Sequence, residues 1–362
     1  RVFLLSEYDR GAGPPWLGST KHLSVASLHT CEECRMVAAL HVRIADNTPR
    51  SLWATRENHD GPKFRSATAG DLGNASVVTI KASRVPAARV VKITWDKLSP
   101  VRAVTWPPDL LELSFGRCFD RPIDGVKWPR TLQRLIFGHA FSQSCSGIVW
   151  PGAILELIFG HEYNHPITEI AWPTSLKRLS FGRKFNQSID GVCWPPALTK
   201  LTLGWSFDQS LKEVALPSTL EVLSIAGVYD RPLDFAFPAR LKKLTLGGHF
   251  NQPLGAIQWP DQLEEISFGW AFNQSLAEVT WPPKLLKLSL GYRFNQPAAH
   301  IRWPQTLREL DLGVFSRQSL EGIVWPQSFR TLLVSRAFDL TGVVLPKEGR
   351  VCRRGHTYCN VQ

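Results

Sequence analysis

Polar side chains that could bind a metal ion or a glycan return along this chain at intervals of about 22 residues. They are Asn164, Asn186, Asn251, Asn273 and Asn295, with Asp120, Asp208 and Asp230 as substituted copies. Asn and Asp side chains also satisfy backbone amides at turns, where no strand can pair them. We expect that second role here. Asn186 and Asn273 match the N-glycosylation sequon, yet their place in this row predicts that they are buried.

Cysteine and histidine near the two ends of the chain raise the question of zinc. The residues are His29, Cys31, Cys34 and His41 near the start, and Cys352, His356 and Cys359 near the end. Zinc accepts both ligand types, but neither spacing is a strong zinc pattern, and a Cys352–Cys359 disulfide fits equally well. We therefore predict no metal site. The other cysteines, Cys118, Cys145 and Cys193, are expected to be incidental small apolar residues.

Hydroxyl groups also recur, in a row that lies along predicted strands. Its members are Ser114, Ser180, Thr202, Ser224, Thr245, Ser267 and Ser289, with Asp311 as the last. No serine there has a histidine and an acid recurring beside it, so a hydrolase triad has no support. Paired carboxylates are absent from this row as well. We predict that the protein is not an enzyme and needs no cofactor.

One row of positions changes its residue type from turn to turn. Directly after a recurring glycine stand Arg117, His139, His161, Arg183, Trp205, Gly227, Gly248, Trp270, Tyr292 and Val314. A packing position would not tolerate this variation, and Arg, Trp and Tyr are enriched in interface hot spots. The alternative is an ordinary solvated loop edge. We predict that a protein partner contacts seven of these residues: Arg117, His139, His161, Arg183, Trp205, Trp270 and Tyr292. The two glycines are expected to divide the row into two contact patches.

These rows exist because the whole middle of the chain repeats. Trp-Pro begins successive turns at Trp106, Trp128, Trp150, Trp172, Trp194, Trp259, Trp281, Trp303 and Trp325, with Leu216-Pro217 and Phe237-Pro238 as substituted copies. A fixed period of this length indicates a solenoid, in which each turn buries its apolar side against its neighbours. An exposed aromatic platform for sugars or bases is the other interpretation of the Trp column. We expect stacked core residues instead.

Within a turn, the alternation of Leu-x-Phe or Leu-x-Leu predicts a half-buried strand. Glycines such as Gly138 and Gly160 follow it, where a positive φ is often needed. A second alternation, Val-x-Trp, predicts another short strand that the next proline ends. The outward charges largely alternate in sign from one turn to the next. They stand at Glu112, Arg134, Glu156, Arg178, Lys200, Lys243, Glu265, Lys287 and Glu309, and we expect them to pair between turns.

The leucine spacing resembles that of a leucine-rich repeat, and Phe-Asn-Gln-Pro/Ser-Ile/Leu with a following Pro and L-x-x-L-x-L-G resembles the FNIP repeat of that superfamily. The resemblance covers roughly residues 104–345. It departs from the ordinary leucine-rich repeat in the position of the Asn, and from FNIP arrays that have Leu-Pro in place of Trp-Pro. The resemblance implies a curved β-solenoid used for binding proteins. With the repeat count of the sequence, we predict a mainly β, leucine-rich-repeat-like β-solenoid of eleven 22-residue turns. The resemblance carries no catalytic residue across.

Outside the repeats we distinguish residues 1–98, a non-repeat region expected to cap the first turn or to interact, from the solenoid at 99–346 and a basic, Cys-containing tail at 347–362. Residues 75–83 and 88–95 are predicted strands. The net charge of +11 lies mostly at the two ends, so we predict no specific nucleic-acid partner. No apolar run is long enough for a transmembrane segment. The start at Arg1 indicates a processed chain or a fragment, and an intracellular location is favoured over secretion.

Taken together, these patterns predict a non-enzymatic protein-binding repeat module, a scaffold or auxiliary subunit of a larger assembly. A polysaccharide-binding solenoid and a carbohydrate-active solenoid enzyme are the alternatives. Sugar binding would require exposed aromatic residues in a line, and only Trp205, Trp270 and Tyr292 qualify in the sequence.

Overall fold

The computed structural model describes residues 101–102, 104–298 and 301–354, the side chain of Trp95, and the backbone of six earlier strands. Those strands are β1 (Ser6–Glu7), β2 (His22–Thr30), β3 (Val37–Ala45), β4 (Trp53–Thr55), β5 (Thr79–Lys81) and β6 (Arg89–Trp95). The chain divides into two compact units, residues 1–182 and residues 183–362. Each is described by itself below.

The first unit changes from antiparallel to parallel pairing at β6. Strands β1, β2, β3 and β6 pair antiparallel in that order, and β4 pairs with β5. From β6 onward each strand is parallel to the next, through β7 (Glu112–Phe115), β8 (Arg134–Ile136), β9 (Glu156–Ile158) and β10 (Arg178–Ser180). The predicted strands in 75–83 and 88–95 are confirmed as β5 and β6. The role of residues 1–98 as a cap stays a prediction.

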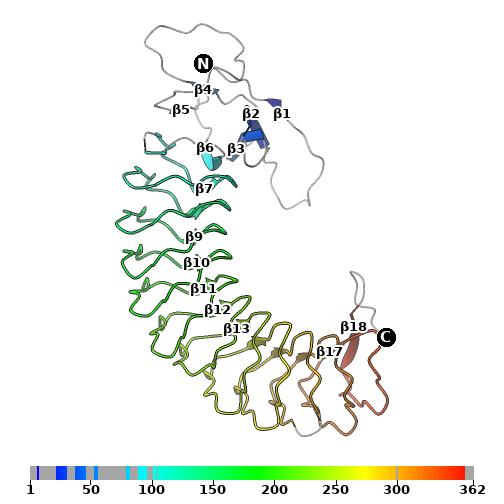
Figure 1. Cartoon of the computed structure of the whole chain (residues 1–362). Helices are drawn as coiled ribbons and strands as arrows, with labels where there is room; N and C mark the ends of the chain where they lie inside the picture. Colours follow the sequence, from blue (N-terminus) through cyan, green and yellow to red (C-terminus); the bar gives the residue numbers. More distant parts are fainter. Residues whose placement is uncertain are drawn as a thin grey trace, which may run out of the picture. The chain divides into compact units, whose positions relative to one another are not determined.

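The second unit is parallel throughout and has one strand in each turn (Figure 1). Its strands are β11 (Lys200–Leu203), β12 (Val222–Ile225), β13 (Lys243–Leu246), β14 (Glu265–Ser267), β15 (Lys287–Ser289), β16 (Glu309–Asp311), β17 (Thr331–Val334) and β18 (Arg350–Arg353). Equivalent residues pair across neighbouring strands, as in Leu288 with Leu310. The chain therefore forms a parallel β-solenoid of about eleven turns of about 22 residues, and the predicted fold class is confirmed.

The core consists of columns in which each turn contributes the same kind of side chain. The second residue of each strand is buried from β7 to β17. A Phe or Tyr column runs beside it with ring centroids 6.2 Å apart, as between Phe272 and Phe294. The Trp column is also inside. The rings of Trp150 and Trp172 stack at 6.5 Å with planes 12° apart. The expected burial of the Trp column is thus confirmed, although Trp128, Trp194 and Trp259 are only half-buried.

The second predicted strand, at Val-x-Trp, is wrong. The described Val-x-Trp segments contain no strand, although Val192 is buried. Each segment lies between two tight turns. Around Val126-Lys127-Trp128, for example, the amide of Val126 donates to the carbonyl of Ile123, and the amide of Leu132 donates to the carbonyl of Pro129. Because these turns leave so few residues between them, and proline has no amide proton, a ladder cannot extend here.

The reason predicted for the glycine column is also wrong at most of its positions. Gly138, Gly160 and Gly182 do not have positive φ, whereas Gly291 and Gly313 do, at 83° and 76°. The glycines of this column share a different feature: the backbone of each lies very close to the backbone of the preceding turn. A Cβ at Gly138 would collide with the carbonyl oxygen of Gly116, and the same contact recurs between later pairs. Glycine is needed because successive backbones nearly touch at this point.

The outward charges pair between turns, as expected. The Arg134 guanidinium lies 3.3 Å from one oxygen of Glu112 and 2.7 Å from one of Glu156. In the second unit Lys243 Nζ lies 2.7 Å from Glu265 Oε2. These pairs partly neutralise one another between neighbouring turns.

The Asn row serves the backbone, which confirms its predicted role. The Asn251 and Asn273 side chains accept hydrogen bonds from the amides of Asn273 and Asn295, at 2.9 and 2.8 Å. Where a Gln follows this row it adds a bond to the previous turn, as from Gln274 Nε2 to the Asn251 carbonyl at 2.9 Å. Asn186 and Asn273 were predicted to be buried, and they are only half-buried. Asn164, in the same row, is exposed. These side chains bond to the next turn at the rim of the solenoid, so water still reaches them.

Candidate functional site

The row after the glycine forms a hydrogen-bonded edge in both units. Most row residues accept a hydrogen bond at their backbone carbonyl. The donor is the backbone amide one residue past the equivalent position in the next turn. Examples are Ala140 to Arg117 at 2.8 Å, Ser206 to Arg183 at 2.8 Å and Arg293 to Trp270 at 3.0 Å. The edge is therefore a regular scaffold on which row side chains stand next to one another. We call it the variable edge: the row from Arg117 to Val314 and the residue that follows each member.

Most of the nominated residues are exposed along this edge. Arg117, His139 and Arg183 are exposed and His161 is half-buried. Across the described residues, four large aromatic side chains are exposed, and all four belong to the variable edge. They are Trp205 at 45%, Trp270 at 47%, Tyr292 at 38% and Phe315 at 47%. Since aromatic side chains elsewhere in the described turns are buried or half-buried, this concentration is a feature of the edge.

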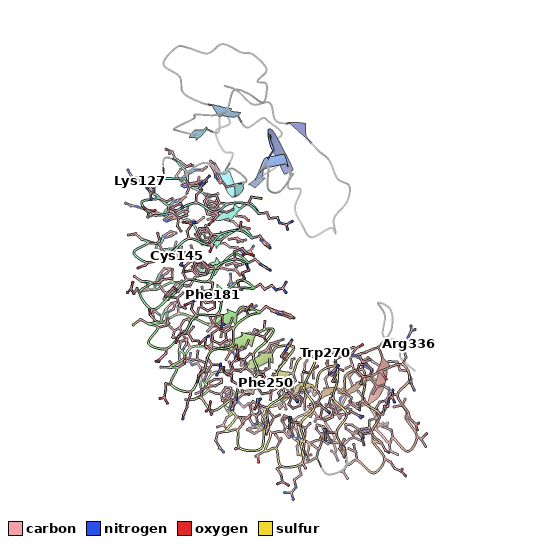
Figure 2. All side chains as sticks on the ribbon, viewed as in Figure 1. Lys127, Cys145, Phe181, Phe250, Trp270 and Arg336 are labelled. Carbon is pink, nitrogen blue, oxygen red and sulfur yellow. The ribbon has the colours of Figure 1, made fainter. Side chains whose placement is uncertain are left out.

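Three of these aromatics form one cluster in the second unit. The Trp270 and Tyr292 rings stack at 6.5 Å with planes 19° apart, and Tyr292 meets Phe315 edge-on at 5.0 Å. The Arg293 guanidinium carbon lies 3.8 Å from the centroid of the Trp270 ring. Figure 2 draws the described side chains and labels Trp270. Stacked and cation–π contacts hold these exposed side chains in place without burying them.

Phe315 was missed in the sequence because it stands one residue away from where a repeat places its phenylalanine. Counting from Gly313, the core aromatic position falls on Ser316, which is 4% exposed, while the neighbouring Phe294 and Phe338 are buried. The amide of Arg317 donates to Asn295 Oδ1 at 2.8 Å, which fixes this register. This turn therefore has a serine in the core aromatic column and an aromatic on the surface. Comparison of each turn with the consensus would have revealed it.

The fourth exposed aromatic of the edge, Trp205, lies earlier in the same unit. The Arg183 guanidinium carbon lies 5.8 Å from the Trp205 ring centroid. Gly227, with φ of 66°, follows Trp205 in the row, and a Cβ there would lie 2.6 Å from Trp205 Cγ. The Trp205 carbonyl oxygen would be nearer still, so glycine is required here by the approach of both the backbone and the indole of Trp205. The small size of Gly227 was predicted to divide the edge into two patches, and that division stays a prediction.

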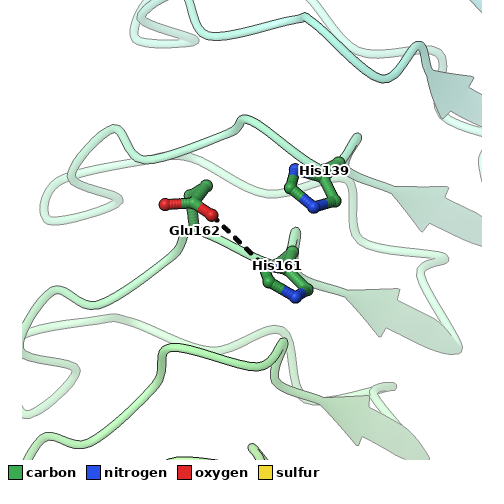
Figure 3. A group of neighbouring side chains, drawn as sticks. All are labelled: His139, His161 and Glu162. Atoms are coloured by element: carbon green, nitrogen blue, oxygen red, sulfur yellow. Dashed lines mark hydrogen bonds and ion pairs between the residues drawn. The ribbon is translucent and has the colours of Figure 1, made fainter.

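In the first unit the variable edge holds imidazole and carboxylate groups. The His139 and His161 rings stack at 4.2 Å with planes 12° apart. His161 Nδ1 lies 3.1 Å from Glu162 Oε1 (Figure 3). The amide of Glu162 donates to the His139 carbonyl at 3.0 Å, so the backbones of the two turns are fixed against each other. Glu162 was not among the predicted site residues.

The cysteines divide into several environments. Cys145 is free and buried, Cys193 is free and exposed, and Cys352 is buried. Cys118 is disulfide-bonded, so the expectation that it is an incidental apolar residue is wrong. Burial raises the pKa of the Cys145 thiol to about 12, and a hydrogen bond with Tyr163 opposes that shift. Cys31, Cys34, His356 and Cys359 lie outside the described residues.

A family model identifies part of this array. The model of the FNIP repeat matches residues 185–226, 229–270 and 272–315. The chain carries FNIP repeats. Trp205, Trp270, Tyr292 and Phe315 all lie within them, so the exposed aromatic residues are variable positions of FNIP turns.

Solved structures similar to the chain include an internalin and a circular leucine-rich-repeat protein. An internalin, inlF, from Listeria monocytogenes strain 4b F2365 is 14% identical, with a TM-score of 0.50 over 76% of this chain and 92% of its own, which shows the fold alone. CroV588, a circular leucine-rich-repeat protein, is 26% identical with a TM-score of 0.38 over 68% of this chain. The match spans 50% of the CroV588 chain. No curated protein sequence matches.

The described part of the chain also contains no helix with the length and apolarity to cross a lipid bilayer.

Proposed function

We propose that the chain is a non-enzymatic protein-binding module, a scaffold or auxiliary subunit of a larger assembly, whose partner contacts the variable edge. The seven nominated contacts are Arg117, His139, His161, Arg183, Trp205, Trp270 and Tyr292, to which Phe315 and Arg293 are now added. The cluster around Trp270 and Tyr292 carries the proposal, because it exposes large aromatic rings while the core columns bury theirs. Solenoid repeats present such rows as extended binding surfaces.

The displaced Phe315 supports the same surface. A phenylalanine in the core column would bury its ring between Phe294 and Phe338, whereas Phe315 leaves most of that hydrophobic stabilisation unused. An exposed aromatic beside Tyr292 gains its value from a partner that covers it. This turn therefore has an aromatic side chain on the surface and none in the core column, as we expect if Phe315 binds a partner.

The orientation of the rings favours a protein over a polysaccharide. A sugar stacks on an aromatic face that is open to solvent. Here Trp270 and Tyr292 are stacked with planes 19° apart, and the Arg293 guanidinium covers a face of Trp270 at 3.8 Å. The rings thus present edges more than faces. Edges of aromatic side chains packed with arginine are typical of protein hot spots.

Arginine side chains on and beside the variable edge of the second unit indicate the partner's chemistry. Arg183 and Arg293 pack on edge aromatics, and Arg317 and Arg336 are exposed just outside the edge, on the last turns. Arginine pairs well with carboxylates through its fork of donors. We infer a partner that inserts apolar side chains between the aromatics and sets carboxylates against these arginines.

The experiment is photo-crosslinking with the full chain. A photo-reactive residue replaces Tyr292, and the same residue replaces Val324, which is exposed but lies off the variable edge. In extract of the source organism, Tyr292 is expected to crosslink one protein that Val324 does not. Trp270→Ala should then weaken binding of that purified protein by about 2 kcal/mol or more, with little change in the melting temperature. Equal crosslinking from both positions, or glycan-array binding that Trp270→Ala abolishes, would reverse the proposal.

A further inference from the structure

We propose that His139, His161 and Glu162 form a binding site for Zn²⁺ on the first unit. One ligand atom from each residue lies within 4.8 Å of the others. A zinc ion bound by two imidazoles and a carboxylate holds its ligands at about 2.0–2.2 Å, so the ligand atoms are about 3.3 Å apart. The three groups must therefore close by a small distance, which side-chain rotation can supply because all three are at least partly solvent-accessible.

The backbone beneath these side chains is already in place. Strands β8 and β9 pair in register, with Ile136 opposite Ile158. The Glu162 amide bonds the His139 carbonyl at 3.0 Å, just beyond the close contact of Gly138 with Gly160. Metal binding would thus require side-chain movement alone, and it would order few groups that the fold has not already ordered.

The combination of residue types occurs at one place along the edge. His139 and His161 stand at consecutive row positions, and their rings stack at 4.2 Å. In the column after the row, where other turns carry residues such as Ala140, Lys184 and Ser206, this turn alone supplies a carboxylate. His161 Nδ1 and Glu162 Oε1, at 3.1 Å, are already about as close as two ligands of one zinc ion.

The donor set selects the metal. Imidazole nitrogens suit Zn²⁺ and other late transition metals, whereas Ca²⁺ and Mg²⁺ require mostly oxygen ligands. Two imidazoles and one carboxylate provide three protein ligands, which leaves a coordination position for water or an outside donor. This inference does not depend on the proposed partner, because the three residues come from one chain.

The test compares metal stoichiometry in matched variants of the full chain. After chelator treatment, the wild type and His139→Ala/His161→Ala are titrated with Zn²⁺ by calorimetry and with Co²⁺ by visible absorption. The wild type should bind one more equivalent than the double variant, and Glu162→Gln should weaken that equivalent at least about tenfold. His249→Ala is the control, because His249 is an exposed histidine of the second unit in the same column as Glu162.

The result is the difference in bound metal equivalents between the wild type and the double variant, so metal bound by cysteines elsewhere in the chain cancels out. A site built from thiolates would appear equally in every variant, and its cobalt complex would show sulfur-to-metal charge transfer. The Co²⁺ equivalent that the double variant fails to bind should show no sulfur-to-metal charge-transfer band in the wild type, since its proposed ligands are nitrogen and oxygen atoms. The proposal is overturned if the wild type and the double variant bind the same number of equivalents. Circular dichroism and melts confirm folding, and Glu162→Gln gives an independent answer should the double variant unfold.

Discussion

Trp303 and Trp325 stack on successive turns with ring centroids 6.2 Å apart and planes 10° apart. Trp281, one turn before Trp303, belongs to the same column and is 8% exposed. The indole N–H of Trp281 has no hydrogen-bond acceptor among the described residues. The column is thus stabilised by the burial and stacking of the rings, with no contribution from the polar atom.

Trp281→Ala is expected to lower the free energy of unfolding by about 3–5 kcal/mol, because it leaves a large cavity between stacked turns. Trp281→Phe keeps an aromatic ring and removes an unpaired donor, so it should cost roughly half of that or less. Chemical denaturation of the two variants measures both values. A near-zero change in Trp281→Ala would contradict the role of the column as core.

Gly138→Ala is expected to destabilise the solenoid by about 1–3 kcal/mol, since a Cβ there collides with the backbone carbonyl of Gly116. Gly152→Ala is the matched control: its Cβ meets nothing within 4 Å, and its φ is not positive. That control should be neutral or slightly stabilising, because alanine restricts the unfolded chain. Thermal melts separate the two variants. If both shift the melting temperature equally, close approach is not what selects glycine at this column.

The main features of the fold were predictable from sequence because every turn repeats one local solution. Leu288 and Leu310 pair because their spacing matches one turn, and the charge on Glu265 meets Lys243 for the same reason. What failed depended on how turns approach one another. The reason for glycine at Gly138 lies in a contact with Gly116, one turn away, that no single repeat contains.

The candidate site was predictable only as a row of variable residues. Trp270 and Tyr292 were recognised by their types, but Glu162 and Phe315 lie one position beyond the row. Their importance comes from contacts with the neighbouring turn, His161 for one and Tyr292 for the other. A pattern that counts positions along the chain does not show which side chains meet across turns.

Cys145 is expected to resist alkylation in the folded protein, while Cys193 reacts. Burial raises the pKa of the Cys145 thiol from an ordinary 9.0 to about 12, so little thiolate forms at pH 8. Cys193 is free and exposed. Mass spectrometry after timed treatment with iodoacetamide measures both sites. Fast labelling of Cys145 without denaturant would show that this part of the core opens readily.

The same burial makes stability depend on pH in the alkaline range. Well below pH 9 the Cys145 thiol is protonated in both the folded and the unfolded state, so its contribution to the free energy of unfolding is constant. Between pH 9 and about 12 the unfolded chain releases the proton and the folded chain retains it, so the free energy of unfolding falls as pH rises. Denaturant titrations at increasing pH should therefore show a shallower decline for Cys145→Ala than for the wild type. Parallel declines would contradict this contribution.

Exchanging Phe315 and Ser316 should separate folding from binding. The double variant Phe315→Ser/Ser316→Phe returns an aromatic ring to the core column, between Phe294 and Phe338, and removes the exposed ring beside Tyr292. Burial of a phenylalanine side chain contributes about 1.5–3 kcal/mol, so the melting temperature should rise. Binding to the partner identified by crosslinking at Tyr292 should weaken, because the aromatic cluster then ends at Tyr292.

Each single variant checks one half of this expectation. Phe315→Ser alone should weaken binding and leave stability nearly unchanged, since the ring is about half exposed, at 47%. Ser316→Phe alone should raise stability and leave Phe315 available for binding. A double variant that melts lower than the wild type would show that this turn has closed around Ser316 and has no room for the ring. Full-strength binding of Phe315→Ser would remove Phe315 from the contact surface and confine the hot spot to Trp270 and Tyr292.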